Sequence, residues 1–170
     1  MITEPVEGRV VYGRGVVDVI VRLTAGQPFY AQMVCQNTVD YANQHEQNWV
    51  TLADLTHVIS DIVDNPLPQM IYTWDALSDD EKIVLSLLAE TLPDGVDYAA
   101  ANQLCASVKA GDYPVNLSEN TVRLTLEEMF RRELLEKDAT EGFRFKIDLF
   151  RLWIRRSHSI WQVVKEVRTL

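Results

Sequence analysis

Apolar residues recur every three or four positions through the first sixty residues of the chain, which is the spacing of helices that bury one face. The pattern predicts three helices, over residues 14–24, 28–44 and 51–62. In the second of these, apolar side chains spread around much of the helix surface, which is typical of a helix at the centre of a bundle. Thr51 stands where the N-cap residue of the third helix belongs.

A short Gly-Gln-Pro sequence, Gly26, Gln27 and Pro28, separates the first two predicted helices. Glycine adopts the left-handed conformation that ends many helices, and proline suits the first turn of a helix because its missing N–H has no intrahelical partner there. The sequence therefore predicts a sharp corner between two helices. Such a corner either only changes the direction of the chain or holds its backbone close to a ligand, and the residues alone leave both interpretations open.

The segment DNPLP, residues 64–68, interrupts the helical pattern, because proline removes a backbone donor and disfavours helix at the residue before it. It predicts a boundary between one domain over residues 1–65 and another over residues 66–170. The second domain is predicted to contain a short helix over PQMIYTWDAL, a helix capped by Ser78 and Glu81, a helix over residues 97–109 and a helix capped by Ser118.

The helix after Ser118 is predicted to have an apolar stripe made of Val122, Leu126, Met129 and Phe130. The segment ELLEKDATEGFRFKI that follows predicts two short strands joined by a turn at residues 140–142, with Gly142 where a positive φ is needed. One last helix is predicted from Leu149 to about Val167. Helices followed by a hairpin are the order of a winged helix-turn-helix domain. We therefore predict a mainly α fold, a helical bundle followed by a winged helix with a small β-hairpin wing.

Charge is distributed unevenly along the 170 residues, whose formal net charge is −9. From residue 143 onward seven basic residues oppose two acidic ones, a net +5, so the preceding residues carry −14. The candidate surface for a nucleic acid or an acidic partner is formed by Arg144, Lys146, Arg155 and Arg156. The predicted recognition helix, residues 118–137, has five acidic and four basic residues. This balance argues against DNA binding, which depends on neutralising phosphates.

The sequence contains none of the common catalytic motifs for phosphate binding, for a nucleophilic serine or for a zinc protease. His45, His57 and His158 lack the spacing of metal ligands, and the two cysteines are interpreted as reduced core thiols. No stretch is long and apolar enough for a membrane span, and the first residues lack the pattern of a signal peptide. We therefore expect a cytoplasmic protein that is not an enzyme, has no metal site and makes no membrane contact.

The order of four segments, ITEPVEG, LTAGQPFYAQMVCQNTVDYAN, WDALSDDEKIVLSLLA and LLEKDATEGFRFKIDLFRLWIRR, resembles the C-terminal half of the ATP-binding module in signal-transducing ATPases of the AAA+/STAND group. In that group a P-loop core is followed by a helical lid and a winged helix, and a Gly-x-Pro at the head of a lid helix touches the nucleotide. The resemblance implies that Gly26, Gln27 and Pro28 contact nucleotide, with Pro28 near the adenine. Gln27 stands where many relatives have histidine, and Ala25 where many have a second glycine.

The resemblance also implies that the chain is a fragment that begins where the lid begins, with residues 1–65 as the lid and 66–170 as the winged helix. We then expect no cofactor and no ATP hydrolysis in this chain, and ATP or ADP with Mg²⁺ in the parent protein. Its partners would be the upstream P-loop core and other domains of the parent. The alternatives are a DNA-binding winged helix and a protein-interaction module, in which the apolar helix over 28–44 could also drive self-association.

Overall fold

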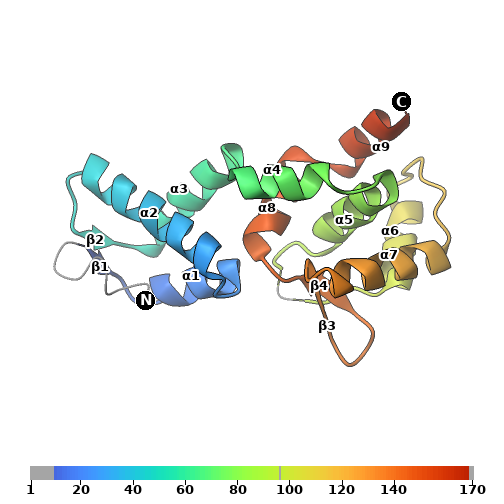
Figure 1. Cartoon of the computed structure of the whole chain (residues 1–170), viewed down its shortest axis with the longest axis horizontal. Helices are drawn as coiled ribbons and strands as arrows, with labels where there is room; N and C mark the ends of the chain where they lie inside the picture. Colours follow the sequence, from blue (N-terminus) through green and yellow to red (C-terminus); the bar gives the residue numbers. More distant parts are fainter. Residues whose placement is uncertain (1–9, 96, 169–170) are drawn as a thin grey trace. The chain divides into compact units, whose positions relative to one another are not determined.

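The computed structural model describes residues 10–95 and 97–168 of the chain (Figure 1). These residues are mainly helical, with nine helices and two small two-stranded sheets among them. Contacts between Cα atoms divide the chain into two compact units, which we call the first unit (Met1–Pro66) and the second unit (Leu67–Leu170). Among the helices described, none combines the length and the apolar character needed to cross a membrane.

The described part of the first unit contains three helices and a two-stranded sheet. Its elements in chain order are β1 (Val11–Tyr12), α1 (Val16–Thr24), α2 (Pro28–Gln44), β2 (Trp49–Val50) and α3 (Leu52–Asp64). Helix α2 contacts both α1 and α3. All three helices predicted for this part of the chain are present, and α3 begins at the predicted cap, where the Thr51 hydroxyl accepts a hydrogen bond from the Asp54 N–H.

Helix α2 is not the surrounded central helix that its composition predicted. Its buried residues lie on one face and are Tyr30, Ala31, Val34, Thr38 and Ala42. Met33 is half-buried and Phe29 is exposed. Two neighbouring helices and a sheet of two-residue strands do not enclose a helix of 17 residues, so several of its apolar side chains keep contact with solvent.

The sheet of the first unit was not predicted. Strands β1 and β2 are parallel, with Val11 opposite Trp49 and Tyr12 opposite Val50. The N–H of Gly13 donates to the Val50 carbonyl at 2.8 Å, and a Cβ at Gly13 would lie equally close to that carbonyl oxygen. A strand of two residues is too short to show an alternating pattern, so only the structure reveals it.

The second unit contains six helices and a β-hairpin within its described residues. In chain order they are α4 (Pro68–Asp75), α5 (Asp79–Thr91), α6 (Ala101–Ala110), α7 (Glu119–Arg131), β3 (Leu135–Lys137), β4 (Phe143–Phe145), α8 (Asp148–Ser157) and α9 (Ile160–Arg168). Helix α5 is the central one: residues 83–89 are all buried, and α5 contacts α6, α7, α8 and α9. The predicted capping residues are confirmed, since Ser78 accepts from the Glu81 N–H and Ser118 from the Thr121 N–H.

The helix predicted over 97–109 begins later, as α6, because the residue before its cap pairs with the hairpin. Ala99 and Phe143 exchange two backbone hydrogen bonds, of 3.0 and 2.9 Å, in an antiparallel bridge. The cap follows at once, where the side chain of Gln103 accepts from the Ala100 N–H at 2.7 Å. Ala99 therefore pairs with β4 instead of belonging to the helix.

The prediction of a single C-terminal helix is wrong, because the helical structure is interrupted between α8 and α9. Helix α8 ends at Ser157, and Ser159 caps the next helix through reciprocal bonds with Gln162. This Ser-x-x-Gln pair is a capping box, the same signature that marks the start of α5 at Ser78. Apolar residues continue at helical spacing across the break, so the apolar pattern did not indicate that one helix ends and another begins there.

The predicted hairpin is present, but two details of this region differ from the prediction. Strands β3 and β4 are antiparallel, yet the residue with positive φ in the turn is Glu141, at 64°, and not Gly142. Gly142 is needed for space, since a Cβ there would lie 2.8 Å from the Cβ of Tyr98.

Phe130, predicted on the buried stripe of α7, is 41% exposed, whereas the other three stripe residues are buried. The stripe is therefore narrower than the sequence suggested.

Candidate functional site

The corner between α1 and α2 has the backbone conformation that its sequence predicted. Ala25 and Gly26 are both left-handed, with φ of 50° and 66°, and the Gly26 N–H donates to the Val21 carbonyl at 3.1 Å. Gln27 is extended, and Pro28 occupies the first turn of α2. Left-handed residues end α1 and a proline starts α2, so the direction of the chain changes within three residues.

The corner is open to solvent. Gly26, Pro28 and Phe29 are exposed, and a Cβ built at Gly26 would have no atom within 4 Å. The side chain of Gln27 makes no capping hydrogen bond to α2. The first N–H groups of a helix have no intrahelical acceptor and carry a partial positive charge, so the start of α2 can donate hydrogen bonds to a ligand.

Positive charge is scarce around this corner. Residues 10–66 contain six acidic side chains and only two basic ones, Arg14 and Arg22. Arg22 lies in the last turn of α1 and is exposed. The corner therefore offers backbone donors, the neutral amide of Gln27 and the rings of Pro28 and Phe29, rather than a cluster of cations. This chemistry suits contact with a base or a ribose better than the binding of a free triphosphate.

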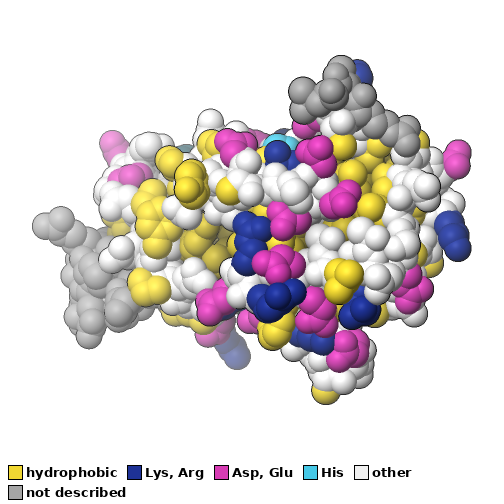
Figure 2. Space-filling view, turned by 45° about the vertical axis from the view of Figure 1, so that its right-hand side comes forward, with side chains coloured by type: hydrophobic (Ala, Val, Ile, Leu, Met, Phe, Trp, Pro, Cys, Tyr) yellow, Lys and Arg dark blue, Asp and Glu magenta, His cyan; other side chains and the backbone are white. Residues whose placement is uncertain are grey.

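The structure pairs the candidate basic residues of the hairpin with carboxylates. Arg144 donates to Glu136 at 2.8 Å and lies over the ring of Tyr98 at 4.6 Å, and Lys146 donates to Glu133 at 3.0 Å. Figure 2 shows the same mixture over the visible face, where basic side chains lie beside acidic ones. Each cation therefore has a neighbouring negative charge, which weakens its attraction for phosphate.

The two candidate basic residues at the end of α8, Arg155 and Arg156, lie in a different environment. Arg155 is exposed at the end of this helix and donates to the Pro93 carbonyl at 2.7 Å. Arg156 is exposed beside it in sequence. Because the acceptor of this hydrogen bond is a neutral backbone carbonyl, the bond does not neutralise the charge of Arg155. Arg155 thus differs from Arg144 and Lys146, which are both paired with carboxylates.

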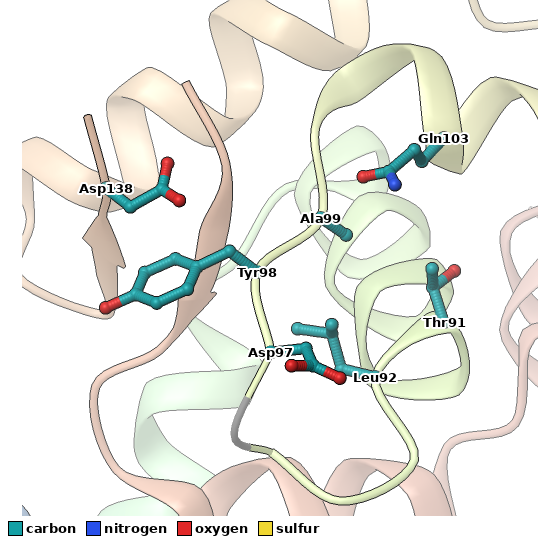
Figure 3. Close-up of a pocket in the computed structure, with 7 residues that line it drawn as sticks. All are labelled: Thr91, Leu92, Asp97, Tyr98, Ala99, Gln103 and Asp138. Atoms are coloured by element: carbon teal, nitrogen blue, oxygen red, sulfur yellow. The ribbon is translucent and has the colours of Figure 1, made fainter. Parts of the chain in front are cut away.

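The second unit has a polar hollow of about 500 Å³ near the hairpin (Figure 3). Its lining residues are Thr91, Leu92, Asp97, Tyr98, Ala99, Gln103 and Asp138. Asp138 accepts hydrogen bonds from the Thr140 hydroxyl and from the Gly142 N–H, and these bonds hold the pKa of its carboxyl below the usual range. Figure 3 shows Asp97 and Asp138 on opposite sides of Tyr98. The two carboxylates therefore do not form a joint acid–base pair.

A buried ion pair in the second unit escaped the sequence analysis. Arg151 is 1% exposed, its Nε donates to the Asp148 carboxylate, and its Nη1 donates to the Leu92 carbonyl at 2.8 Å. The loop after α5 closes over this pair at Gly95, whose φ is 70° and where a Cβ would lie 2.0 Å from Asp148 Oδ1. The i, i+3 spacing in α8 is the signal that could have found the pair.

Neither cysteine has the surroundings of a catalytic thiol. Cys35 and Cys105 are free and half-buried, and burial raises the pKa of both thiols. The protonated form therefore dominates at neutral pH, and it is a poor nucleophile. Within the part of the chain that the structure describes, no group of three or more histidine, cysteine, aspartate or glutamate side chains could hold a metal ion.

Comparisons with models of protein families, with curated proteins and with solved structures give no match to the chain.

Proposed function

We propose that the first unit is the helical lid, and the second unit the winged helix, of a STAND-type ATPase of the AAA+ group. A P-loop core in the same polypeptide would bind ATP or ADP with Mg²⁺. These two units perform no chemistry themselves. They couple the nucleotide state of the core to other domains of the parent protein, because ATP and ADP make different contacts with the lid and so favour different arrangements.

The observation that carries this proposal is the open corner at Gly26, Gln27 and Pro28. A corner that only reversed the chain would need no free space around its glycine and no exposed ring beside its proline. Here Gly26 is left-handed with open space around it, and Pro28 and Phe29 are exposed at the uncapped start of α2. These features support contact with a nucleotide that another domain holds.

The order of elements in the second unit supports the winged-helix part of the proposal. Helices α5, α6 and α7 precede the β3–β4 hairpin, and the extended residue Ala99, between α5 and α6, pairs with Phe143 of β4. Three helices with an extended bridge residue between the first two, followed by a hairpin wing, are the arrangement expected for such a domain.

DNA binding is the less favoured use of this unit. Arg144 and Lys146 are paired with Glu136 and Glu133, and α7 itself exposes Glu119 as well as Arg123. Phosphates would have to compete with these carboxylates for the same cations. Transmission of a conformational change to neighbouring domains makes no such demand on the surface charge.

The proposal has a genetic and a biochemical test. The coding sequence before residue 1 should encode a strand, a glycine-rich loop ending in Lys-Ser or Lys-Thr, and a later strand that ends in an acidic residue. In the polypeptide that contains this core, Pro28→Ala should speed the release of a fluorescent ADP analogue about fivefold, which corresponds to roughly 1 kcal/mol of lost contact.

Pro68→Ala is the matched control for this experiment. Pro68 is also an exposed first-turn proline after an extended N-cap residue, but it begins α4 in the second unit. Its replacement should leave ADP release unchanged. Equal effects of the two substitutions, or no effect of Pro28→Ala, would show that the corner does not contact nucleotide.

A further inference from the structure

The loop that follows α5 contains the one Asp-Gly pair of the sequence, Asp94 and Gly95. Asp94 is exposed, and both residues lie in irregular structure between α5 and α6. The N–H of Gly95 donates to no backbone carbonyl among the described residues. Hydrogen bonds hold the N–H groups of helices and strands, whereas this N–H lies in a surface loop that offers no such restraint.

An aspartate that precedes glycine can rearrange the backbone that joins the two residues. The main-chain nitrogen of the glycine attacks Cγ of the aspartate carboxyl group, so that a C–N bond forms, a C–O bond breaks and one molecule of water leaves. Water then opens the succinimide ring at either of its two carbonyls, which returns aspartate or gives isoaspartate, whose main chain runs through Cβ. Glycine favours the ring closure because it has no side chain beside the attacking nitrogen.

The structure holds this loop on both sides of the aspartate. Before it, the Nη1 of Arg151 donates to the carbonyls of Leu92 and Pro93, at 2.8 and 3.2 Å. After it, Gly95 packs so closely against the Asp148 carboxylate that no Cβ would fit. Asp148 and Arg151 are the buried ion pair of α8, so the loop separates this pair from solvent.

We propose that Asp94 is a site of spontaneous isomerisation to isoaspartate, and that the isomer releases the loop from the Asp148–Arg151 pair. Isoaspartate adds one methylene carbon to the main chain between the two points at which the loop is held. A loop whose length fits a glycine against Asp148 cannot keep both contacts after this change. Water then reaches an ion pair whose partners are buried in the unmodified protein. This inference does not depend on nucleotide binding.

Mass spectrometry of the whole chain tests the chemical step. The purified protein is kept for several weeks at neutral pH and physiological temperature in heavy-oxygen water and is then digested. The peptide that contains Asp94 should divide into two species of equal mass and different retention, and both should gain heavy oxygen. Fragmentation assigns the change to Asp94 or to Asp97, which is exposed in the same loop but precedes Tyr98. No more isoaspartate at Asp94 than at Asp97 would overturn the proposal.

The same incubation in guanidinium chloride separates the reactivity of the sequence from the effect of the fold. The unfolded chain should form isoaspartate at Asp94, because ring closure needs only the two residues and a mobile backbone. The folded chain should form it as well, because the loop is exposed and irregular. Isoaspartate that appears only in the unfolded chain would show that the fold protects Asp94, which contradicts the proposal.

Asp94→Glu is the matched variant for the structural consequence. It keeps the negative charge, but its ring would need six members and closes far more slowly. Aged wild-type protein should unfold at a lower urea concentration than fresh protein, whereas aged and fresh Asp94→Glu should unfold at the same concentration. An equal loss in both proteins would assign the damage to another residue. Isoaspartate at Asp94 without any change in the urea midpoint would show that the loop keeps its contacts, against the proposal.

Discussion

Arg151 shows how much a single buried cation can depend on its partners. Its guanidinium lies inside the second unit against the Asp148 carboxylate and the carbonyls of Leu92 and Pro93. Arg151→Met would leave the carboxylate buried without a compensating charge and would release the loop after α5. We expect a loss of about 3–5 kcal/mol in the free energy of unfolding, measured by urea denaturation of the second unit.

Two further variants make this result interpretable. Arg131→Met removes an exposed partner of Glu128 in α7 and should cost about 0–1 kcal/mol, because exposed ion pairs contribute little. Asp148→Leu combined with Arg151→Met should be more stable than Arg151→Met alone, since no lone charge remains. A loss for Arg151→Met no larger than that for Arg131→Met would mean that water reaches the pair.

At the scale of one helix, the start of α3 offers a matched pair of threonines. Thr51 caps this helix, and its hydroxyl accepts from the Asp54 N–H, while the Asp54 carboxylate accepts from the Thr51 N–H at 2.8 Å. Thr51→Ala should lower the stability of the first unit by about 1 kcal/mol. Thr56→Ala lies on the exposed face of the same helix and should change it little, because alanine is the better helix former. Urea unfolding followed through the first unit compares them, and equal losses would contradict the capping role.

Elements defined by local chemistry could be predicted from the sequence, and those defined by distant pairing could not. Thr51, Ser78 and Ser118 start helices through contacts three residues away, so the sequence shows them directly. The start of α6 depends instead on Ala99 pairing with Phe143, more than forty positions along the chain. No pattern in the residues around Ala99 indicates that contact.

The candidate site shows the same difference between features set by local contacts and features set by distant pairing. The conformation of the corner was predictable because Gly26 and Pro28 act on their own backbone. The pairing of Arg144 was not, because it depends on the hairpin register that places Glu136 directly opposite. Whether a basic residue in a sequence carries an unpaired positive charge can therefore be decided only when its cross-strand neighbours are known.

At the scale of the molecule, the first unit exposes three apolar side chains, Val11, Trp49 and Leu52, which we call the apolar patch. These side chains are 47%, 53% and 47% exposed. Val11 and Trp49 are opposite each other in the β1–β2 pair. A Cβ added at Gly13 would lie within 4 Å of the Trp49 side chain, and one added at Gly15 would lie within 4 Å of the Leu52 side chain. These three side chains come from β1, β2 and the first residue of α3, and α2, which the sequence favoured as the source of an exposed apolar face, also exposes Phe29. Contiguous exposed apolar groups mark surfaces that other protein covers.

If this patch is normally covered by another domain, the isolated chain should cover it with a second copy of itself. We expect reversible self-association in sedimentation velocity experiments, and Trp49→Ser should weaken it about tenfold or more, because tryptophans at the centre of an interface often contribute roughly 2 kcal/mol. Trp161→Ser is the control, since Trp161 is 55% exposed in the second unit but packs its ring edge against Tyr113. A monomer at every concentration, or equal effects of the two substitutions, would show that the patch is not an interface. A selective effect of Trp49→Ser would identify β1 and β2 as the face on which the first unit meets its partner.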